Sequence, residues 1–481
     1  MLLVAAFDFG TTYSGYAFSF RDDPNKIQTN QSWYAGGGAS RLVSLKTPTS
    51  VLLTPEGEFD KFGFEAEDKY ATLAEDNEHH GWRLFRRFKM VLHNNTHLTK
   101  DVTVEDFCGK RMTAFPLFVM SIKYLRDHLL KAVTTQKIGI EETDISYVLT
   151  VPGIWDDNAK RFMRDAAVAA AIDPARLKLA LEPECASIWC ETLGTDVRGA
   201  VAIAGSQYMV VDLGVCLSVS LRDLADKHFK HSVEERIAAM DIQENSITPK
   251  GKDKLKIVGT LIQSWFKGSI DLLIQHIKSL LAEAKMEHVH TIILVGGFGE
   301  SPFVQERMRN KIAGVTLIVP QEAGLAVLRG AVRFGHNPSI VSSRIMKYTY
   351  GLRGYDTFDE KKHANEKKIW MNERWVVSEC FIVFVRVNEE VRIDQQQTKT
   401  SIPTRETSHI SVYRTTHENP VYATDLGCEL LGTVELENST DIPFQQQITE
   451  TLFMLGDTEL LVKLRNTATG KEAYMLFECF K

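Results

Sequence analysis

Two apolar runs, each closed by an aspartate and then a glycine, lie far apart along the chain. The first covers residues 2–9, turns through Gly-Thr-Thr at 10–12, and continues as an apolar run at 16–20. Apolar runs without polar alternation are typical of strands buried on both faces. The segment 208–214 repeats the pattern of the first run. We therefore expect a duplicated α/β lobe.

Apolar residues at spacings of three and four predict helices between these strands. Helices are expected over residues 113–135, from Asp156-Asp157 onward, from Pro183 onward, and over 254–284, 303–313 and 321–335. In 254–284 the apolar stripe includes Trp265, which we expect to face inward. Buried strands are expected at 145–151 and 292–297, and the polar segment 21–40 predicts a loop.

Beyond about residue 340 the pattern changes to short alternating strands rich in Val, Ile, Thr and aromatic residues. Such alternation, broken by short turns, predicts a β-sandwich. The expected strands cover residues 378–387, 408–413, 432–436, 446–454 and 459–464. A chain of 481 residues is too long to pack around one hydrophobic core, so several domains are expected. We divide the chain into three parts, 1–200, 201–338 and 339–481.

Composition and charge make some classes of protein unexpected for this chain. The net charge is −6, with 56 basic and 62 acidic residues and no basic run, so a nucleic-acid binder is not expected. No apolar stretch is long enough to predict a membrane span, and the apolar start lacks the basic leader of a signal peptide. Seven scattered cysteines without a CxxC pair favour a reducing compartment, which is the cytoplasm or the nucleus.

The strongest chemical candidate is the block Asp-Phe-Gly-Thr-Thr-Tyr-Ser-Gly at residues 8–15. Glycine lets the backbone approach a phosphate, and the hairpin amides and threonine hydroxyls can donate to its oxygens. Asp8 can hold a hydrated Mg²⁺ ion. The alternative is a plain hairpin that is rich in small residues, and the further segments described next make that alternative weaker.

The same block resembles the first phosphate loop of the 70-kilodalton heat-shock protein family, and its continuation to residue 20 is similar to the divergent member-12 branch. Further segments resemble the family in the same order: 85–92, 150–155, 160–167, 181–187, 294–301, 428–436 and 459–472. The resemblance implies an α/β fold, an actin-like ATPase nucleotide-binding domain of two ribonuclease H-like lobes, followed by a β-sandwich-like domain. No helical lid precedes the last residue, Lys481.

The resemblance also implies ATP or ADP and Mg²⁺ as ligands. It gives catalytic roles to Asp8, Glu182 and Asp212, with both aspartates holding Mg²⁺ through water and Glu182 orienting a water molecule. It assigns nucleotide contacts to Gly10, Thr11, Thr12, Tyr13, Lys89, Gly214, Gly296, Gly297 and Phe298. Arg86 and Arg87 are rivals of Lys89 for the phosphate-facing cation, and a solvated basic face is the alternative for all three.

The second phosphate loop departs from the family pattern. Of its glycine run only Gly214 remains, while Val215 and Leu217 place bulky side chains where the backbone should approach phosphate. The stretch after Ser218 contains no candidate for the family's adenine-packing helix. We therefore expect an incomplete second lobe.

These features favour an ATP-binding, chaperone-related protein with weak or absent hydrolysis, because hydrolysis requires both phosphate loops to close on the nucleotide. The alternative is a non-enzymatic, truncated isoform that acts as an interaction or regulatory protein without nucleotide. A small-molecule kinase of the same superfold is a third interpretation, which the C-terminal β-rich part disfavours. The expected partners are client polypeptides or signalling proteins at the C-terminal β-domain.

Overall fold

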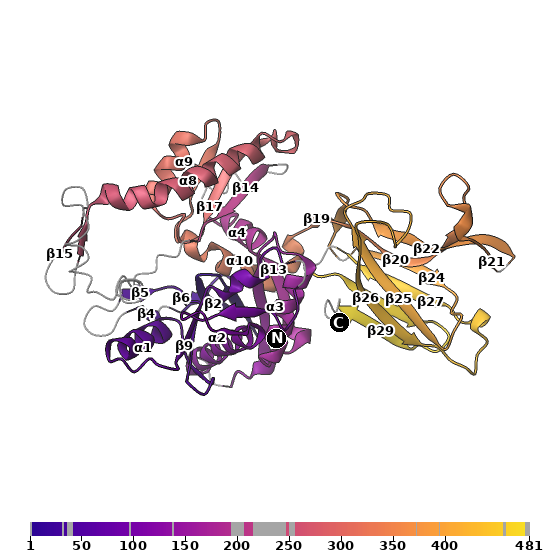
Figure 1. Cartoon of the computed structure of the whole chain (residues 1–481), viewed down its shortest axis with the longest axis horizontal. Coiled ribbons are helices and arrows are strands. Elements are labelled where there is room, and N and C mark those ends of the chain that lie inside the picture. Colours follow the sequence, from indigo (N-terminus) through magenta and orange to yellow (C-terminus); the bar gives the residue numbers. More distant parts are fainter. Residues whose placement is uncertain are drawn as a thin grey trace.

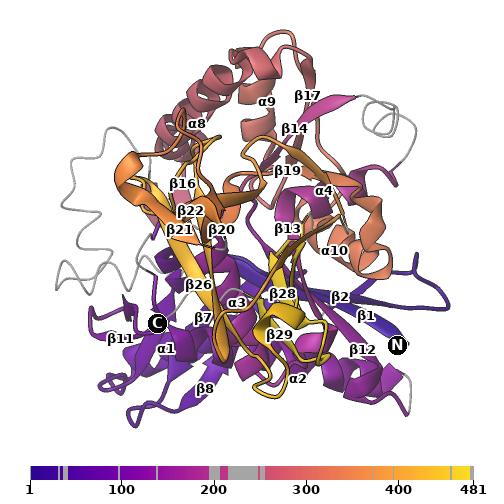
Figure 2. The same cartoon turned by 90° about the vertical axis from the view of Figure 1, so that its right-hand side faces the viewer.

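The computed structural model describes residues 2–30, 33–35, 42–95, 98–136, 139–193, 206–214, 247–249, 255–371, 373–393, 395–455 and 458–476. Over this part of the chain the molecule is mixed α/β, and the C-terminal strands form a separate body beside the helix-containing part (Figure 1). Figure 2 shows that body facing the viewer, in front of the N-terminal elements.

The N-terminal sheet has the strand order β13-β12-β1-β2-β3, and β6 also pairs with β2. Its strands are β1 (Leu3–Phe9), β2 (Tyr13–Phe20), β3 (Gln28–Thr29), β6 (Thr47–Pro48), β12 (Ile145–Val151) and β13 (Leu177–Leu181). β1 and β2 are antiparallel, whereas β12 runs parallel to both β1 and β13. The hairpin expected at 10–12 therefore joins two paired strands at the carboxyl end of β1.

The unbroken apolar run of β1 is explained by helices on both faces of the sheet. Its odd-numbered residues, such as Phe7, belong to a core that includes residues of α2 (Phe115–Gln136) and α3 (Asp157–Ala169). Its even-numbered residues Val4 and Ala6 share a second core with α4 (Glu182–Cys190) and α10 (Ala326–His336). All seven residues of β1 are buried.

A second sheet consists of three parallel strands in the order β14-β17-β18. These are β14 (Gln207–Asp212), β17 (Val289–Val295) and β18 (Thr316–Ile318), and residues of α8 (Gly259–Leu281) and α9 (Pro302–Lys311) share their core. The repeated Asp-ended pattern is thus a strand, as predicted, but none of the residues of β14 is buried. The altered second phosphate loop from Val215 onward, and the stretch after Ser218, lie outside the described residues.

The C-terminal strands form two larger antiparallel sheets, β21-β22-β20-β25-β26 and β24-β27-β28-β29. Their bounds are β20 (Thr349–Thr357), β21 (Lys368–Met371), β22 (Arg374–Val385), β24 (Gln396–Ser401), β25 (Thr407–Thr415), β26 (Cys428–Glu437), β27 (Thr449–Met454), β28 (Leu461–Asn466) and β29 (Glu472–Leu476). One core joins the two sheets, and in it Phe384 stacks on Phe453 with ring centroids 3.8 Å apart. Each strand predicted in this part overlaps an observed one.

The remaining elements are short. The strands are β4 (Trp33–Ala35), β5 (Leu42–Ser44), β7 (Ser50–Leu53), β8 (Phe59–Phe62), β9 (Arg83–Arg86), β10 (Thr103–Glu105), β11 (Arg111–Thr113), β15 (Ile247–Pro249), β16 (Leu255–Ile257), β19 (Ser343–Ile345) and β23 (Glu390–Arg392). The helices are α1 (Phe64–Glu75) and the single turns η1 (Phe88–Leu92), η2 (Glu142–Asp144), η3 (Pro174–Arg176), η4 (Ala284–Met286), η5 (Ala323–Leu325), η6 (Pro338–Ile340), η7 (Asn365–Lys367) and η8 (Phe444–Gln446).

Three sequence predictions about local structure were wrong. The segment 21–40, predicted as a loop, contains the strands β3 and β4, which pair with β2 and β5. The helix predicted over 254–284 begins only at Gly259, because 255–257 pairs with 247–249. Trp265 is 50% exposed, since α8 packs mainly through Ile270, Ile274 and Ile277.

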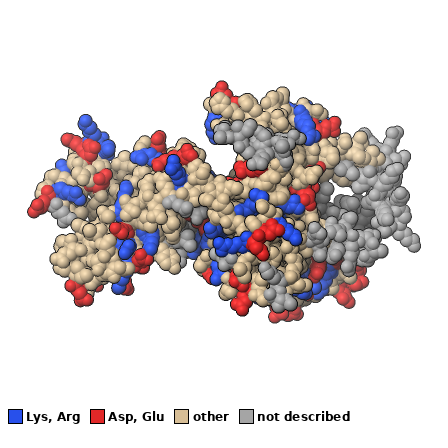
Figure 3. All heavy atoms as spheres, turned by 180° about the vertical axis from the view of Figure 1, so that it is seen from behind, with Lys and Arg blue, Asp and Glu red and all other residues tan. Residues whose placement is uncertain are grey.

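Surface properties are consistent with the composition. Basic and acidic side chains are interspersed over the face of the molecule shown in Figure 3. Among the helices that the structure describes, none combines the length and apolar character of a membrane-spanning segment. The five cysteines within the described ranges, at 108, 185, 190, 380 and 428, are all free thiols.

Candidate functional site

A cleft of ≈ 720 Å³ lies where β1, β12, β13, β14 and β17 end. Its walls come from the turn after β1, the first residue of α4, and the glycines after β17. The carboxyl ends of parallel strands are a common place for ligand sites in α/β proteins. The volume is within the range of small-molecule sites, about 300–1,000 Å³.

The structure brings every predicted site residue to this one cleft. Its lining includes Asp8, Gly10, Thr11, Thr12, Tyr13, Lys89, Glu182, Asp212, Gly214, Gly296, Gly297 and Phe298. The sequence prediction missed other lining residues, namely Ser44, Leu45, Lys46, Pro152, Glu300, Gly324 and Leu325. Among these, Lys46 has the most chemical significance because it contacts Asp8.

Thr49, the residue after β6, forms hydrogen bonds with the Gly-Thr-Thr turn. The Thr49 hydroxyl donates to the carbonyl of Gly10 at 2.7 Å and lies 2.7 Å from the Ser14 hydroxyl. The Thr49 amide donates to the carbonyl of Thr12 at 2.8 Å. These bonds satisfy carbonyl groups of the turn from the side of β6 and thereby fix its backbone.

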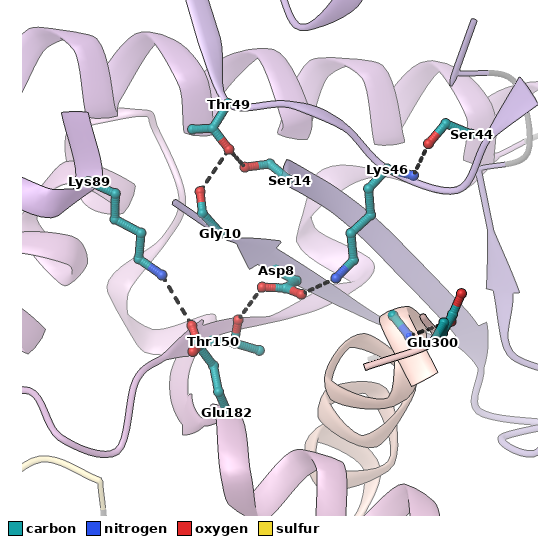
Figure 4. A network of polar contacts seen from close by, with 11 residues as sticks. Asp8, Gly10, Ser14, Ser44, Lys46, Thr49, Lys89, Thr150, Glu182 and Glu300 are labelled. Atoms are coloured by element: carbon teal, nitrogen blue, oxygen red, sulfur yellow. Dashed lines mark hydrogen bonds and ion pairs between the residues drawn. The ribbon is translucent and has the colours of Figure 1, made fainter. Parts of the chain in front are cut away.

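Asp8 is buried and both oxygens of its carboxylate are engaged (Figure 4). Oδ1 accepts a hydrogen bond from Thr150 at 3.2 Å, and Oδ2 accepts one from the Lys46 ammonium at 2.6 Å. Burial acts to raise the pKa of Asp8, but the charge and hydrogen bond of Lys46, with smaller contributions from Lys89 and Thr150, hold that pKa below its usual value. Asp8 is therefore an anion in this cleft.

Glu182 is the first residue of α4 and forms an ion pair with Lys89 at 3.1 Å. The Lys89 ammonium also lies 4.8 Å from the centroid of the Trp155 ring. Burial, together with the carboxylates of Asp8 and Asp212, outweighs the Lys89 charge and raises the pKa of Glu182 to about 7. Glu182 thus changes its protonation state near neutral pH.

Asp212 ends β14 and opens to the cleft. Desolvation by the surrounding protein atoms and the charge of Asp8 raise the pKa of its carboxyl group, although the side chain is exposed to the cleft. The close approach of the next strand requires a glycine, because a Cβ at Gly296 would lie 2.2 Å from Asp212 Oδ1 and its φ is +84°. The two strand ends are therefore packed directly against each other.

Of the three basic candidates before α2, only Lys89 lines the cleft. Arg86 forms an ion pair with Glu67 at 3.0 Å instead. Lys46 has no local sequence signature, since it follows a short strand and approaches Asp8 only because β6 pairs with β2. The pairing of two segments about 30 residues apart could not be predicted from hydrophobic pattern alone.

The donor set can be compared with the needs of Mg²⁺, which prefers oxygen ligands and retains several waters. Within the described residues no three acidic, histidine or cysteine side chains are close enough to hold an ion directly. Asp8 and Asp212 both face the cleft, but the Asp8 oxygens already accept from Thr150 and Lys46. The Lys46 ammonium therefore competes with a hydrated ion for Asp8.

Comparison with known proteins finds relatives that match over nearly the whole of this chain. No family model matches the chain. The human heat shock 70 kDa protein 12A is 27% identical over 98% of this chain and 90% of its own length, and the mouse protein matches to the same extent. The human heat shock 70 kDa protein 12B is 26% identical over the same shares.

The alignment with protein 12A spans 616 positions, which exceeds the 481 residues of this chain by 135. The relatives thus contain segments that have no counterpart here. The resemblance inferred from the phosphate-loop block nevertheless extends over nearly the whole chain. The chain is a divergent relative of the member-12 branch of the 70-kilodalton heat-shock protein family.

Proposed function

We propose that this chain binds an adenine nucleotide, ATP or ADP, in the cleft between β1 and β14, and that it hydrolyses ATP weakly or not at all. The observation that carries the proposal is that residues chosen from five separate sequence segments line one cleft. Small residues at the turn after β1 and two lysines suit a polyphosphate, which requires close backbone approach and positive charge.

We further infer that the N-terminal mixed sheet and the parallel sheet β14-β17-β18 belong to the two lobes of an actin-like ATPase, and that the C-terminal sheets form a β-sandwich-like domain. Asp8, the penultimate residue of β1, and Asp212, the last residue of β14, line the same cleft and support the first inference. The shared core of the C-terminal sheets supports the second. A chaperone-related role, client polypeptides or signalling proteins as partners, and a cytoplasmic or nuclear location extend this proposal by analogy with the family.

Weak hydrolysis is expected because the carboxylates that the reaction would need already form ion pairs with lysines of the cleft. Positioning and charge stabilisation around the terminal phosphate determine the rate of phosphoryl transfer. Glu182, the candidate for orienting water, is held by Lys89, and Asp8 is held by Lys46. If Mg²⁺ binds, Asp8 and Asp212 would hold it through water, and the ion would neutralise phosphate charge.

A second candidate is a non-enzymatic interaction protein without nucleotide. The observation that favours it is the weak packing of β14, which has no buried residue, whereas β1 is buried throughout. A loosely packed strand end would position Asp212 and Gly214 less firmly against a ligand. The two candidates differ in one measurable property, which is affinity for nucleotide.

Calorimetric titration of the folded chain with ATP and ADP, with and without Mg²⁺, tests the proposal. A ligand that binds only the folded state also raises the melting temperature. Thr12→Val keeps the side-chain shape but removes a hydroxyl from the turn, so it should weaken binding about tenfold. Thr72→Val on the exposed surface of α1 is the matched control and should change nothing.

Two results would contradict nucleotide binding at this cleft. The first is the absence of both heat and melting shift at millimolar nucleotide, which would favour the interaction protein. The second is equal affinity in the Thr12→Val variant and the wild type, which would move the binding site elsewhere.

A further inference from the structure

We propose that Lys46 is a built-in cation of the cleft, which binds nucleotide phosphate beside Asp8 and allows the nucleotide to bind without Mg²⁺. The inference rests on the proposed nucleotide site and deepens it. Neither a lysine at this position nor metal-independent binding was expected from the sequence. The argument starts from the contacts of the Lys46 side chain.

The Lys46 ammonium occupies the open side of the Asp8 carboxylate. Its Nζ lies 2.6 Å from Oδ2, while Thr150 donates to Oδ1 at 3.2 Å. Figure 4 shows Lys46 and Lys89 reaching toward this carboxylate and Glu182 from opposite sides. A hydrated metal ion at Asp8 would compete with the shorter of these two contacts for the same carboxylate.

Lys46 is fixed in place by the backbone on either side of it. Its amide is 3.4 Å from the Ser44 hydroxyl, and the next residue, Thr47, pairs with Ser14 in β2. The side chain is 19% exposed, so the ammonium remains accessible from the cleft that it lines. A lysine with an anchored main chain and a cleft-facing head group is suited to bind a ligand anion.

The charges around Lys46 favour a cation at this point even without a ligand. The carboxylates of Asp8, Asp212 and Glu182 all act on its ammonium group. Two lysines face three carboxyl groups, of which Glu182 changes its protonation state near pH 7, and a triphosphate would add several negative charges to this cleft. Because metal-free nucleotide is strongly anionic, it requires cations supplied by the protein, and Lys46 and Lys89 are the two that line the cleft within the described residues.

The ammonium has three donor hydrogens, so Lys46 can keep its bond to Asp8 and still donate to a phosphate oxygen. Mg²⁺ would place a second positive charge close to the first and would compete for the same carboxylate oxygen. The wild-type protein should therefore gain little affinity from Mg²⁺. Removal of the Lys46 charge should make nucleotide binding dependent on the metal.

The test is calorimetric titration of the full chain with ATP, once in excess EDTA and once with Mg²⁺. For the wild type we expect dissociation constants within about threefold of each other. For Lys46→Met we expect a loss of about 10–100-fold in EDTA, the size of a charge-assisted hydrogen bond, and a smaller loss with Mg²⁺. Lys46→Arg should retain binding in EDTA, and Lys362→Met, at an exposed position, is the matched control.

The outcomes separate this inference from the proposed function. Binding that requires Mg²⁺ in the wild type, or unchanged EDTA binding in Lys46→Met, would overturn the role of Lys46 and leave the nucleotide site intact. No binding in either buffer by a folded protein would overturn both. If Lys46→Met does not fold, the wild-type comparison and the Lys46→Arg variant still decide the question.

Discussion

The Lys89 ammonium donates to Glu182 Oε1 at 3.1 Å and so joins the turn η1 to the first residue of α4. The side chains are 2% and 15% exposed, so the ion pair is largely shielded from water. Removing one partner of a buried ion pair leaves an uncompensated charge, at a cost of about 3–5 kcal/mol. We expect a loss of unfolding free energy of this order for Lys89→Met at about pH 8, above the pKa of Glu182, measured by urea denaturation.

Lys285→Met serves as the control, because that lysine is 76% exposed and its pair with Glu283 lies on the surface. The change there should remain below about 1 kcal/mol. A similar, small effect in both variants would show that the Lys89–Glu182 pair contributes little to stability.

The raised pKa of Glu182 predicts a specific pH dependence of stability. The folded state holds this proton up to about pH 7, whereas the unfolded chain releases it near 4.5. The wild type should therefore lose stability relative to Glu182→Gln as pH rises through this window, by an amount on the order of 3 kcal/mol. Unfolding of both proteins at about pH 5, 6, 7 and 8 measures the difference.

Glu65→Gln is the matched substitution on the surface, since Glu65 is 63% exposed beside Lys61. Unfolding of this variant at the same pH values controls for the Glu-to-Gln change at an exposed position. A flat difference for Glu182→Gln would mean that Glu182 titrates like an ordinary surface carboxyl.

The contact between α4 and the C-terminal part predicts a measurable coupling energy. Arg344 in β19 donates to both oxygens of Glu184, with both distances 2.7 Å. Bidentate pairs that are largely shielded from water are stronger than exposed ones. A double-mutant cycle with Arg344→Met and Glu184→Gln should give a coupling of about 1–3 kcal/mol.

The exposed pair Lys61–Glu65, measured by the same cycle, should give only about 0.3–0.5 kcal/mol. Equal values for the two pairs would indicate that the Arg344–Glu184 contact is not maintained in solution.

Two helical glycines should respond to alanine in opposite directions. In α10, a Cβ at Gly330 would lie 1.7 Å from the carbonyl oxygen of Cys185 in α4, so the helices cannot accept it without separating. We expect Gly330→Ala to destabilise the protein by several kcal/mol, at least ~2 kcal/mol. In α8, nothing lies within 4 Å of such an atom at Gly268, and Gly268→Ala should stabilise by about 0.5–1 kcal/mol.

Thermal unfolding of the two variants provides the test. A tolerated Gly330→Ala substitution would show that α4 and α10 leave more room at Gly330 than the 1.7 Å clearance to the Cys185 carbonyl oxygen implies.

The hydrophobic pattern predicted those elements whose structure is determined by residues close together in the sequence. The apolar run at residues 2–9 was identified because a doubly buried strand has a continuous hydrophobic pattern. The run that ends in Asp212 was identified by its likeness to the first, although β14 contains no buried residue. The site residues at the strand ends followed from the same pattern and from the family resemblance. The domain division itself remains a prediction.

What could not be predicted depends on contacts between distant segments. Lys46 approaches Asp8 through the pairing of β6 with β2, which no local pattern specifies. Trp265 belongs to the apolar stripe of α8 but is 50% exposed, because the helix packs through Ile270, Ile274 and Ile277, and the stripe alone does not specify which of its residues meet the sheet. The roles of the glycines and carboxylates in binding a nucleotide await the titrations described above.

The position of α10 has a consequence for how the protein is made on the ribosome. The face of β1 formed by Val4 and Ala6 is covered by a helix whose residues are translated on the order of 300 positions later. At a translation rate of ~5–20 residues per second, α10 is synthesised tens of seconds after β1. During synthesis the nascent chain therefore exposes this apolar surface, which makes the incomplete chain more prone to aggregation than the finished protein.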